Sequence, residues 1–473
     1  MDLTHGVVYT PHTLQLDKWN PDRLNESGCN YVRIYWVDLA NTRRCRILPI
    51  EHFKALLKSN RPGVNIAKVT LGVVYLTLAP GFAPIGEYLY AIDIASLRPC
   101  PFAPGHFAVL GQFEEKTALT GPNDKPSVEV NLCPRTLLRR ITQELKQSYN
   151  TEFLVGFETE FILLKSTDPV EPASIHDFSA SVGLLAGSLP TQILQEIADA
   201  LVTSGIKLEM YHTEAAPGQY EIVGVPRTPL EAADALVFTR EIIVQIAGKH
   251  GLHASFAPRP FMYSAGSSTH AHISVHNTSG EPKPADEMSK HESAFLAGLM
   301  AHLPAIVALT LPTSASYARM TDGVWSGGTY VNWGTENREA PVRLTNFHSP
   351  SSRNFELRFI DGTANPHIAL AAVLAAGLIG IRDSTPLEVK DCSGTKSAAE
   401  LTEEERKTLG ITTRMSLSLA EARAALEKDS ELSALLGADF IEAFSAVNKT
   451  LDAELNGHSE SKEQKLTRLV KFY

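Results

Sequence analysis

The sequence predicts an α+β fold with a small N-terminal β domain and a larger domain whose strands carry polar side chains. Strand-like runs fill the first hundred or so residues, whereas helical apolar spacing and strands alternate beyond residue 134. Polar residues of the kinds that bind metals also recur at every second position, the period of a strand, in residues 156–161, 219–221, 270–274 and 354–358. With 473 residues the chain has room for two domains, which we expect at 1–120 and 121–473.

The N-terminal part is predicted to be mainly strand. Runs rich in β-branched and aromatic residues predict strands at 31–37, 46–48 and 71–76, with a helix at 50–57 between the last two. A passage rich in Pro and Gly follows at 97–105, and then a polar loop at 114–125 before Pro126. This loop is the best candidate for the boundary between the two domains.

The rest of the chain shows a repeated helical period. Apolar spacing predicts helices at 134–149, 193–202, 229–250 and 291–309, with Pro134 suited to a first turn. Strand-like regions surround Arg343 and Arg358, and the last hundred residues are mostly helical apart from a polar link at 386–405. The longest apolar run, 368–381, is too short and too interrupted by Gly for a membrane span, so we expect a buried helix.

Charge and cysteine usage narrow the classes of function. The net charge is −10 and the pI is near 5.9, which favours neither a nucleic acid nor an anionic membrane as partner. Five scattered cysteines form neither a disulfide framework nor a CxxC pair, and the N-terminus lacks a secretion signal. A cytoplasmic enzyme acting on small molecules is therefore the expectation.

The alternating stretches bring chemistry-bearing groups together. Glu158 and Glu160 would stand on one face of a strand, roughly 6–7 Å apart. Two further strands would carry His270, His272 and Ser274, and Glu356 with Arg358, while Glu214 lies just upstream of Glu221. Hard divalent cations favour oxygen ligands, and phosphoryl transfer needs cations around the phosphate. The residues alone therefore predict a metal-dependent enzyme that uses ATP.

Taken together and in order, the motifs resemble the glutamine synthetase family. The matching segments are FETEF at 157–161, TEAAPGQYE at 213–221, PRP to HAHIS at 258–274, NREAPVR at 337–343 and ELR to ANP at 356–366. The resemblance implies a β-grasp-like N-terminal domain and a catalytic domain with a curved antiparallel sheet flanked by helices. It also implies ATP and two or more Mg²⁺ or Mn²⁺ ions per site, in a ring-shaped homo-oligomer with each site between subunits.

Roles for individual residues follow from the same resemblance. Glu160, Glu214 and Glu221 would hold one ion, and Glu158, His270 and Glu356 the second. The nucleotide would be bound by Glu209, His272, Ser274 and Arg343. The amino-acid substrate would be bound by Gly266, Arg319 and Arg358. Arg338, Glu214 and Arg319 would act in catalysis, Arg338 by stabilising the transferring phosphoryl group.

The chain departs from the family pattern where ammonium would bind. No acid stands near residues 63–66, no tyrosine lies at 178–182, and the loop after Arg319 has no glutamate, since Asp322 has the wrong spacing. Ala265 replaces an asparagine, and Asn354 replaces an arginine, with Arg353 adjacent. Binding a cation without a counter-charge is costly. We therefore predict transfer of glutamate, or a similar acid, to an organic amine, with Trp325 and Trp333 lining its pocket.

The sequence leaves three alternatives open. The protein could be a glutamine synthetase that uses ammonia, or a catalytically silent structural or regulatory relative. A kinase of guanidino compounds is a third alternative, against which the paired glutamates and the two alternating histidines speak. Trp325 and Trp333 are about as compatible with packing or an interface as with a substrate wall.

Overall fold

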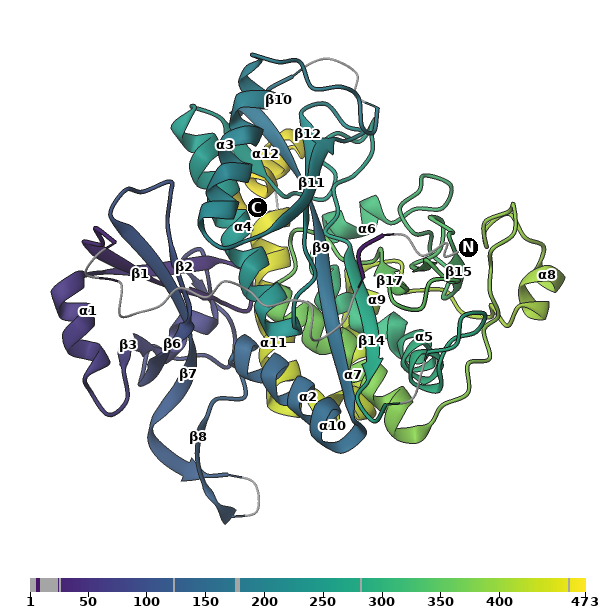
Figure 1. The fold of residues 1–473 in the computed structure, drawn as a ribbon, viewed down its shortest axis with the longest axis horizontal. Coiled ribbons are helices and arrows are strands. Elements are labelled where there is room, and N and C mark those ends of the chain that lie inside the picture. The colour runs from purple at the N-terminus through teal and green to yellow at the C-terminus, as the bar shows by residue number, and fades with distance from the viewer. Residues whose placement is uncertain are drawn as a thin grey trace.

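The computed structural model describes residues 6–8, 24, 27–121, 124–174, 179–280, 283–457 and 460–473. It contains two main open sheets and many helices, which confirms the predicted mixture of strands and helices. In Figure 1 the first sheet stands apart from the larger body, which is built on the long strands β9 and β14. The proposed division near residue 120 falls within a hairpin of the first sheet, whose last strand ends at Glu129.

The first sheet has the order β2-β1-β7-β6-β3, with β8 paired to β7. Its strands are β1 (Tyr31–Val37), β2 (Arg43–Pro49), β3 (Gly63–Ala67), β6 (Glu87–Pro99), β7 (His106–Thr120) and β8 (Pro126–Glu129). Helix α1 (Ile50–Leu57) follows β2 with the predicted bounds. Strand β1 pairs in parallel with β7 and antiparallel with β2. The predicted strands at 31–37 and 46–48 and the helix at 50–57 are thus confirmed.

Two predictions in this part are wrong. Residues 71–76 do not form one strand, because a 3₁₀ turn (Lys68–Leu71) leads into the two-residue strands β4 (Val73–Val74) and β5 (Thr77–Leu78). Tyr75 turns the chain between them with a φ of 51°. The polar segment from Glu114 is likewise not a loop, because β7 continues to Thr120 and pairs with β8. The threonines of this segment favour a strand, and its polar residues suit a strand that is exposed to solvent.

The second sheet has the order β11-β12-β9-β14-β17-β16-β15, with β10 and β13 also paired to β9. Its strands are β9 (Thr151–Thr167), β10 (Val170–Pro172), β11 (Leu208–Thr213), β12 (Gln219–Gly224), β13 (His253–Ser255), β14 (Ala271–Asn277), β15 (Trp333–Thr335), β16 (Val342–Thr345) and β17 (Asn354–Leu357). All pairs are antiparallel except β15 with β16. Strand β9 pairs with β14 along its first half and with β12 along its second.

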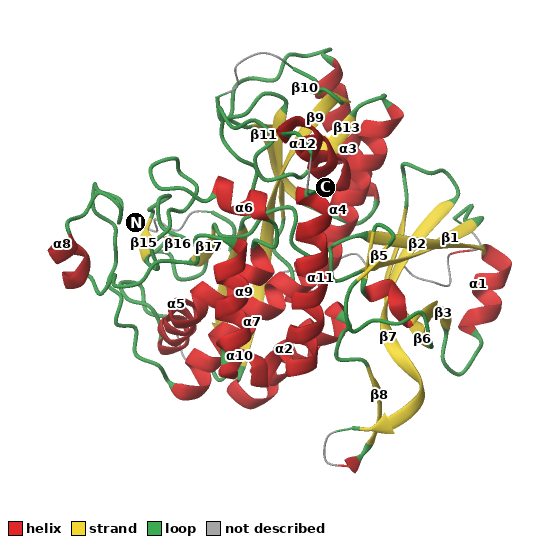
Figure 2. Ribbon diagram, turned by 180° about the vertical axis from the view of Figure 1, so that it is seen from behind, coloured by secondary structure: helices red, strands yellow, loops and turns green. Residues whose placement is uncertain are grey.

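The larger body also contains helices, of which α2 and α4 pack against β9. They are α2 (Pro134–Tyr149), α3 (Leu189–Thr203), α4 (Pro229–Lys249), α5 (Lys290–Thr310), α6 (Ser314–Arg319), α7 (Pro366–Asp383), α8 (Glu403–Thr408), α9 (Leu419–Lys428), α10 (Ser430–Leu436), α11 (Ala438–Asn456) and α12 (Lys462–Phe472). Figure 2 shows α4, α7 and α11 in front of β9, and in Figure 1 they lie behind it. The helices predicted at 134–149, 193–202, 229–250, 291–309 and 368–381 are confirmed within a few residues.

Helices α5 and α7 form the centre of the core. Both are long and apolar enough to cross a membrane, but 83% and 89% of their apolar windows are buried inside the protein, as in core helices. They approach closely because glycines face each other: a Cβ on Gly298 would lie 2.2 Å from the carbonyl oxygen of Ala376, and one on Gly380 would lie 2.0 Å from that of Ala294. Only glycine fits at these two positions.

A buried ionic cluster joins three helices. Arg135 of α2 donates to both carboxylate oxygens of Asp234 on α4, at 2.9 and 2.8 Å, and to Asp93 of β6 at 2.7 Å. His367 of α7 lies 2.8 Å from the same Asp234 carboxylate through its Nε2. Burial would raise the pKa of Asp234, but Arg135 and His367 hold it well below its usual range. The cluster therefore ties the first sheet to the helical core.

Candidate functional site

Strand β9 places two acids where the large sheet changes partners. Its residues Phe153, Val155 and Phe157 pack into the core, so Glu158 and Glu160 reach the opposite face by strand alternation. Glu221 of β12 stands opposite Glu160, and the Glu158 amide donates to the carbonyl oxygen of His270 at 3.0 Å. The predicted acids therefore meet because β14 ends its pairing with β9 at the point where β12 begins.

A cavity of about 480 Å³ opens over this junction. Most of the residues predicted for the site line it: Glu158, Glu160, Glu209, Glu214, Glu221, Gly266, His270, His272, Arg319, Arg338 and Arg358. Among the described residues, Ser274, Arg343 and Glu356 are the predicted ones outside this lining. Glu356 nevertheless lies next to it, because β17 pairs with β14 and sets Glu356 opposite His272.

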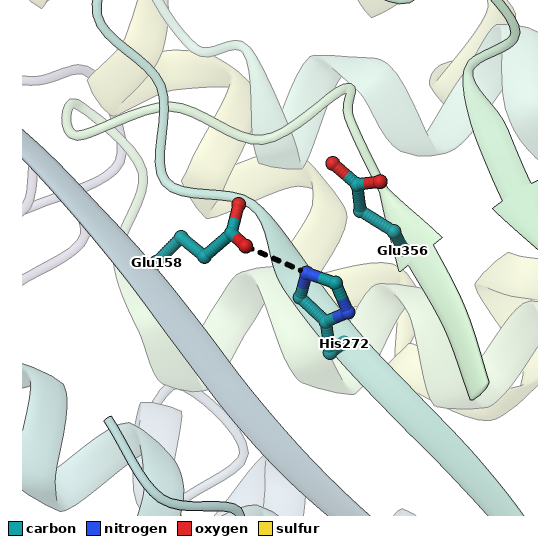
Figure 3. Close-up of side chains that lie close together, drawn as sticks. All are labelled: Glu158, His272 and Glu356. Carbon is teal, nitrogen blue, oxygen red and sulfur yellow. Dashed lines mark hydrogen bonds and ion pairs between the residues drawn. The ribbon is translucent and has the colours of Figure 1, made fainter. Parts of the chain in front are cut away.

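The first group of possible metal ligands consists of Glu158, His272 and Glu356, whose ligand atoms all lie within 4.8 Å of one another (Figure 3). The Nε2 atom of His272 is 3.0 Å from Oε1 of Glu158. His270 borders the same group, since its Nδ1 is 3.2 Å from Oε2 of Glu158 and 3.5 Å from Oε1 of Glu356. The structure therefore sets both histidines beside the two carboxylates, whereas the resemblance gave only His270 to this ion.

The charges of this group suit a divalent cation. Burial, with help from Arg358, lowers the pKa of His270 to about 4, so its imidazole is neutral at physiological pH. Burial would raise the pKa of Glu356, but Arg358 and the two histidines lower it to about 2, so the carboxylate is ionised. Burial would lower the pKa of His272, but the Glu158 carboxylate raises it to about 9. A bound cation would take the place of the His272 proton between these groups.

The second group consists of His212, Glu214 and Glu221, again with ligand atoms within 4.8 Å of one another. His212 lies between the acids, its Nε2 3.1 Å from Glu221 and its Nδ1 3.7 Å from Glu214. The resemblance did not assign a role to His212. The signal was nevertheless in the sequence, because His212 and Glu214 alternate as Glu158 and Glu160 do.

Glu160 lies beside this second group as a buried carboxylate that accepts hydrogen bonds and is repelled by the charge of Glu221. It accepts hydrogen bonds from Nε2 of Gln219 at 2.8 Å, from the amide of Ser268 at 3.1 Å and from the Ser268 hydroxyl. Burial and the charge of Glu221 raise its pKa to about 8, and burial raises that of Glu221 to about 7. A cation between these acids would relieve both the burial cost and the mutual repulsion, so the residues present fit a metal ion.

Two buried arginines lie beside these possible metal ligands in the cavity. Arg319 is 3% exposed and donates to the Arg358 carbonyl oxygen at 3.1 Å. Arg358 donates to Glu356 and, at 2.7 Å, to the carbonyl oxygen of Trp325. The Nε–H groups of both arginines are buried without a partner among the described residues. Such groups need an acceptor, and a carboxylate of a ligand would supply one.

Two more predicted residues line the same cavity. Arg338 is exposed at the cavity wall. Gly266 fits against Arg319 with no room to spare, since a Cβ there would lie 2.5 Å from Arg319 Cγ and 2.7 Å from the carbonyl oxygen of Pro258. The glycine thus lets the backbone approach the arginine as closely as the site requires.

Asn354, at the position where the family resemblance predicts an arginine, contacts a possible metal ligand. Asn354 lies 2.8 Å, through Oδ1, from Nδ1 of His272, and so orients that ring toward Glu158. Arg353 does not reach the cavity, because it is buried in a bidentate pair with Glu292 at 3.2 and 2.9 Å. The nucleotide-binding roles predicted for Ser274 and Arg343 stay predictions: Ser274 bonds to His276, and Arg343 pairs with Glu336 and Glu356.

The loop after Arg319 carries one of the two tryptophans considered as substrate walls. Trp325 is 73% exposed and lines the cavity. Trp333 does not line it: its ring is buried and its Nε1 donates to the carbonyl oxygen of Val389 at 2.8 Å, so it is a packing residue. Phe178, in the segment compared with the family tyrosine, lies outside the described residues.

The two acids of this loop region are used within the loop. Asp322 accepts from the amide and hydroxyl of Thr329, at 2.8 and 2.9 Å. Glu339 accepts from the backbone amides of Gly323, at 3.0 Å, and Trp325. Neither acid belongs to the cavity lining. Asp322 therefore does not replace the missing glutamate.

Comparisons with known proteins agree with this geometry. A family model for the catalytic domain of glutamine synthetase matches residues 131–466. Protein fluG of Emericella nidulans is 35% identical over 447 residues, which cover 93% of this chain but 48% of that protein, so the chain spans about half its length. A glutamine synthetase of Methanocaldococcus jannaschii is 33% identical, with 78% of this chain and 80% of that protein covered.

Another relative, whose name specifies a polyamine, and a solved structure are also similar to this chain. The gamma-glutamylpolyamine synthetase GlnA3 of Streptomyces coelicolor is 31% identical, with 67% of this chain and 68% of that protein covered. The structure of a GmaS/ADP complex superposes with a TM-score of 0.76 at 25% identity, covering 94% of this chain and 98% of that chain. With its motifs on the predicted strands and its match to the catalytic-domain model, this chain belongs to the glutamine synthetase family.

Proposed function

We propose that the protein is an ATP-dependent ligase that activates a carboxylate of glutamate, or of a similar acid, and joins it to an organic amine. The observation that carries this proposal is one cavity that brings Arg319, Arg338 and Arg358 together with two carboxylate–histidine groups. The carboxylates and histidines suit cations around a polyphosphate, and the arginines suit the carboxylates of an amino acid.

The residues would divide the work as follows. Glu158, His270, His272 and Glu356 would hold one Mg²⁺ or Mn²⁺, and His212, Glu214, Glu221 and Glu160 another. When bound, the ions neutralise the charge of the phosphoryl group in transfer. The free Nε–H groups of Arg319 and Arg358 would bind the carboxylate of the acid, and Arg338 would contact the equatorial oxygens of the transferring group.

The proposed reaction has two steps. A carboxylate oxygen of the acid attacks the γ-phosphorus of ATP, the bond to the bridging oxygen breaks, and ADP leaves with its electron pair. The amine nitrogen then attacks the carbonyl carbon of the acyl phosphate, phosphate leaves, and the nitrogen loses a proton. Activation is needed because a carboxylate is a poor acyl donor at neutral pH.

An organic amine is supported by the wall of the cavity next to the arginines. Ammonium would need a carboxylate there, but Asp322 and Glu339 accept hydrogen bonds from atoms of the loop after Arg319. The exposed side chains at this wall are Val324 and Trp325, which offer apolar surface to the carbon chain of an amine. The name of the Streptomyces relative, which specifies a gamma-glutamylpolyamine product, supports an organic acceptor in a member of this family.

The experiment is phosphate release from ATP with Mn²⁺ and glutamate, measured against ammonium, methylamine, butylamine and 1,4-diaminobutane. A γ-glutamyl product identified by mass spectrometry, and formed faster from an organic amine than from ammonium, supports the proposal. Trp325→Ala should weaken the preference for the longer chains, whereas Tyr263→Ala, an equally exposed aromatic outside the cavity lining, should not.

Three results would point elsewhere. Ammonium preferred over every organic amine would make the protein a glutamine synthetase. A folded protein that binds no nucleotide with Mn²⁺ would be the silent relative. Folded protein that binds nucleotide but releases no phosphate with any amine would require a different acid. We also propose a ring-shaped homo-oligomer, a domain division near residue 120 and a cytoplasmic location. Light scattering of the purified protein tests the oligomeric state.

A further inference from the structure

One arginine outside the catalytic cavity binds the backbone of two of the cavity's walls. Half-buried Arg259 does not belong to the cavity lining, but all three nitrogens of its side chain donate to backbone carbonyl oxygens. Nε donates to Ser264 at 3.2 Å, Nη2 to Met262 at 3.3 Å and Nη1 to Ala318 at 2.8 Å. The guanidinium therefore joins the turn that contains the first two acceptors to helix α6, which contains the third.

The bond to α6 restrains the backbone directly before an arginine of the cavity. The carbonyl oxygen of Ala318 and the Cα atom of Arg319 belong to one planar peptide unit, so holding the first restricts the second. Carbonyl oxygens in the last turn of a helix lack partners within the helix, and a cation is favoured at this end. The start of α6 is held separately, because the Thr313 hydroxyl accepts from the Ser316 amide at 3.3 Å. Loss of Arg259 would therefore free the end of α6 and leave its first turn in place.

The other two bonds hold the loop that contains Gly266. The amide of Ser267 donates to the carbonyl oxygen of Pro258 at 2.7 Å, which closes this loop at its base. Between these two residues, the side chain of Arg259 holds the carbonyl oxygen of Ser264, two positions before the glycine. The path of the loop up to Gly266 therefore depends on the same guanidinium that restrains the end of α6.

The two segments that Arg259 joins are also the two that touch inside the cavity. A Cβ on Gly266 would lie 2.5 Å from Cγ of Arg319, so the loop backbone packs directly on the stem of that arginine. The Nε–H of Arg319 is buried without a partner among the described residues. A shift of either segment would move this donor relative to a ligand.

We propose that Arg259 is a positioning residue, which sets Gly266 and Arg319 at the separation needed to bind the carboxylate of the acid substrate. The inference rests on the proposed function, in which Arg319 binds that carboxylate. Arginine suits the task because its planar fork presents several donors in fixed directions. Lysine has one nitrogen on a flexible stem, and would keep the charge at the end of α6 without the fork.

The possible metal ligands have supports of their own. Glu160 accepts from the amide of Ser268 at 3.1 Å and from Nε2 of Gln219 at 2.8 Å. Gln219 also donates to the carbonyl oxygen of Gly266 at 2.9 Å, which gives the loop a second contact. Loss of Arg259 should therefore weaken binding of the acid more than binding of ADP with Mn²⁺.

Steady-state kinetics and chemical rescue test the consequence for the acid. For Arg259→Ala, kcat/KM for glutamate should fall at least about tenfold, because small misplacements at a reacting site are costly. Guanidinium chloride below denaturing concentrations should restore part of the loss, whereas sodium chloride should not. Arg61→Ala is the control, since exposed Arg61 also donates to two backbone carbonyl oxygens, of Glu115 and Lys116, but in the first sheet. It should keep the rate and show no response to guanidinium.

Hydrogen exchange tests the link itself without a substrate. In Arg259→Ala the amides of Ser267 and Met320, which bond to Pro258 and Ser316, should exchange faster, and guanidinium should slow them again. The amides of β14 should be unaffected. Arg259→Lys should keep the Tm of the unmodified protein but not its kcat/KM, which separates the fork from the charge.

Each outcome bears on the proposal. Unchanged exchange at both amides, unchanged kcat/KM in folded Arg259→Ala, full activity of Arg259→Lys, or equal losses of acid and ADP binding would each overturn it. If the unmodified protein joins glutamate to no amine, the proposed function fails, and exchange alone decides whether Arg259 holds the two segments. If Arg259→Ala does not fold, Arg259→Lys carries the same comparisons of kinetics and exchange.

Discussion

A methyl group added at Gly266 should damage binding of the acid substrate more than it damages the fold. A Cβ at this position would lie 2.5 Å from Arg319 Cγ and 2.7 Å from the Pro258 carbonyl oxygen, and contacts under 3.0 Å force something to shift. The Pro258 backbone has little freedom to move, so the side chain of Arg319 is the group that shifts. Relief of the contact displaces it by about 1 Å, a misplacement that costs on the order of a hundredfold in rate.

The assay for Gly266→Ala is steady-state ligation with the acid varied at saturating ATP, together with thermal unfolding. We expect kcat/KM for the acid to fall about a hundredfold. Overpacking should lower the free energy of unfolding by about 1–3 kcal/mol. Binding of ADP with Mn²⁺ should fall less, because most of the possible metal ligands are held on strands β9, β11, β12, β14 and β17. Gly248→Ala is the control, since an added Cβ there meets no atom within 4 Å.

The reasoning is refuted if folded Gly266→Ala keeps kcat/KM for the acid within twofold of the unmodified protein. It is also refuted if the loss appears equally in ADP binding, because the glycine would then support the whole cavity and not the position of Arg319.

Three further predictions concern other parts of the structure. Asp234→Asn leaves the buried Arg135 partly unpaired and should lower the free energy of unfolding by about 3–5 kcal/mol. Because the pKa of Asp234 is held below its ordinary value, the carboxylate contributes stability above about pH 4, and this contribution is lost as the pH falls further. Unfolding measured at decreasing pH should therefore show the stabilities of the two proteins converging. Asn354→Leu removes the acceptor that orients His272 and should weaken Mn²⁺ binding about 10–100-fold, measured by electron paramagnetic resonance; unchanged affinity would contradict that orienting role. Gly298→Ala should destabilise the α5–α7 contact by at least about 1–3 kcal/mol in urea unfolding, and a stabilised variant would contradict the close approach.

Local periodicity predicted most of the elements that position the site. The alternation of Glu158 with Glu160 and of His270 with His272 is a property of neighbouring residues, so the strands β9 and β14 could be recognised without a structure. The helices with apolar spacing, such as α2 and α4, were predictable for the same reason. The same alternation is present at His212 and Glu214, two members of the second group of possible metal ligands.

Pairings between distant segments could not be predicted in this way. That Arg353 faces Glu292, while its neighbour Asn354 faces His272, depends on how β17 pairs with β14 and where α5 lies. The burial of Trp333 likewise follows from contact with Val389, a residue far along the chain. Such partners are set by tertiary packing, which residue spacing within one strand does not encode.

The anchoring of the loop after Arg319 has a consequence for how this protein can change over evolutionary time. Its shape depends on Asp322 within it and on Glu339 beyond β15, and Trp325 is exposed on it, whereas the acids and histidines over the sheet are fixed by strand pairing. Substitutions at the tip of the loop can therefore alter which molecule is accepted without disturbing the machinery that activates the acid. Selection, or a protein engineer, can act on preference and on catalytic power as two nearly separate traits.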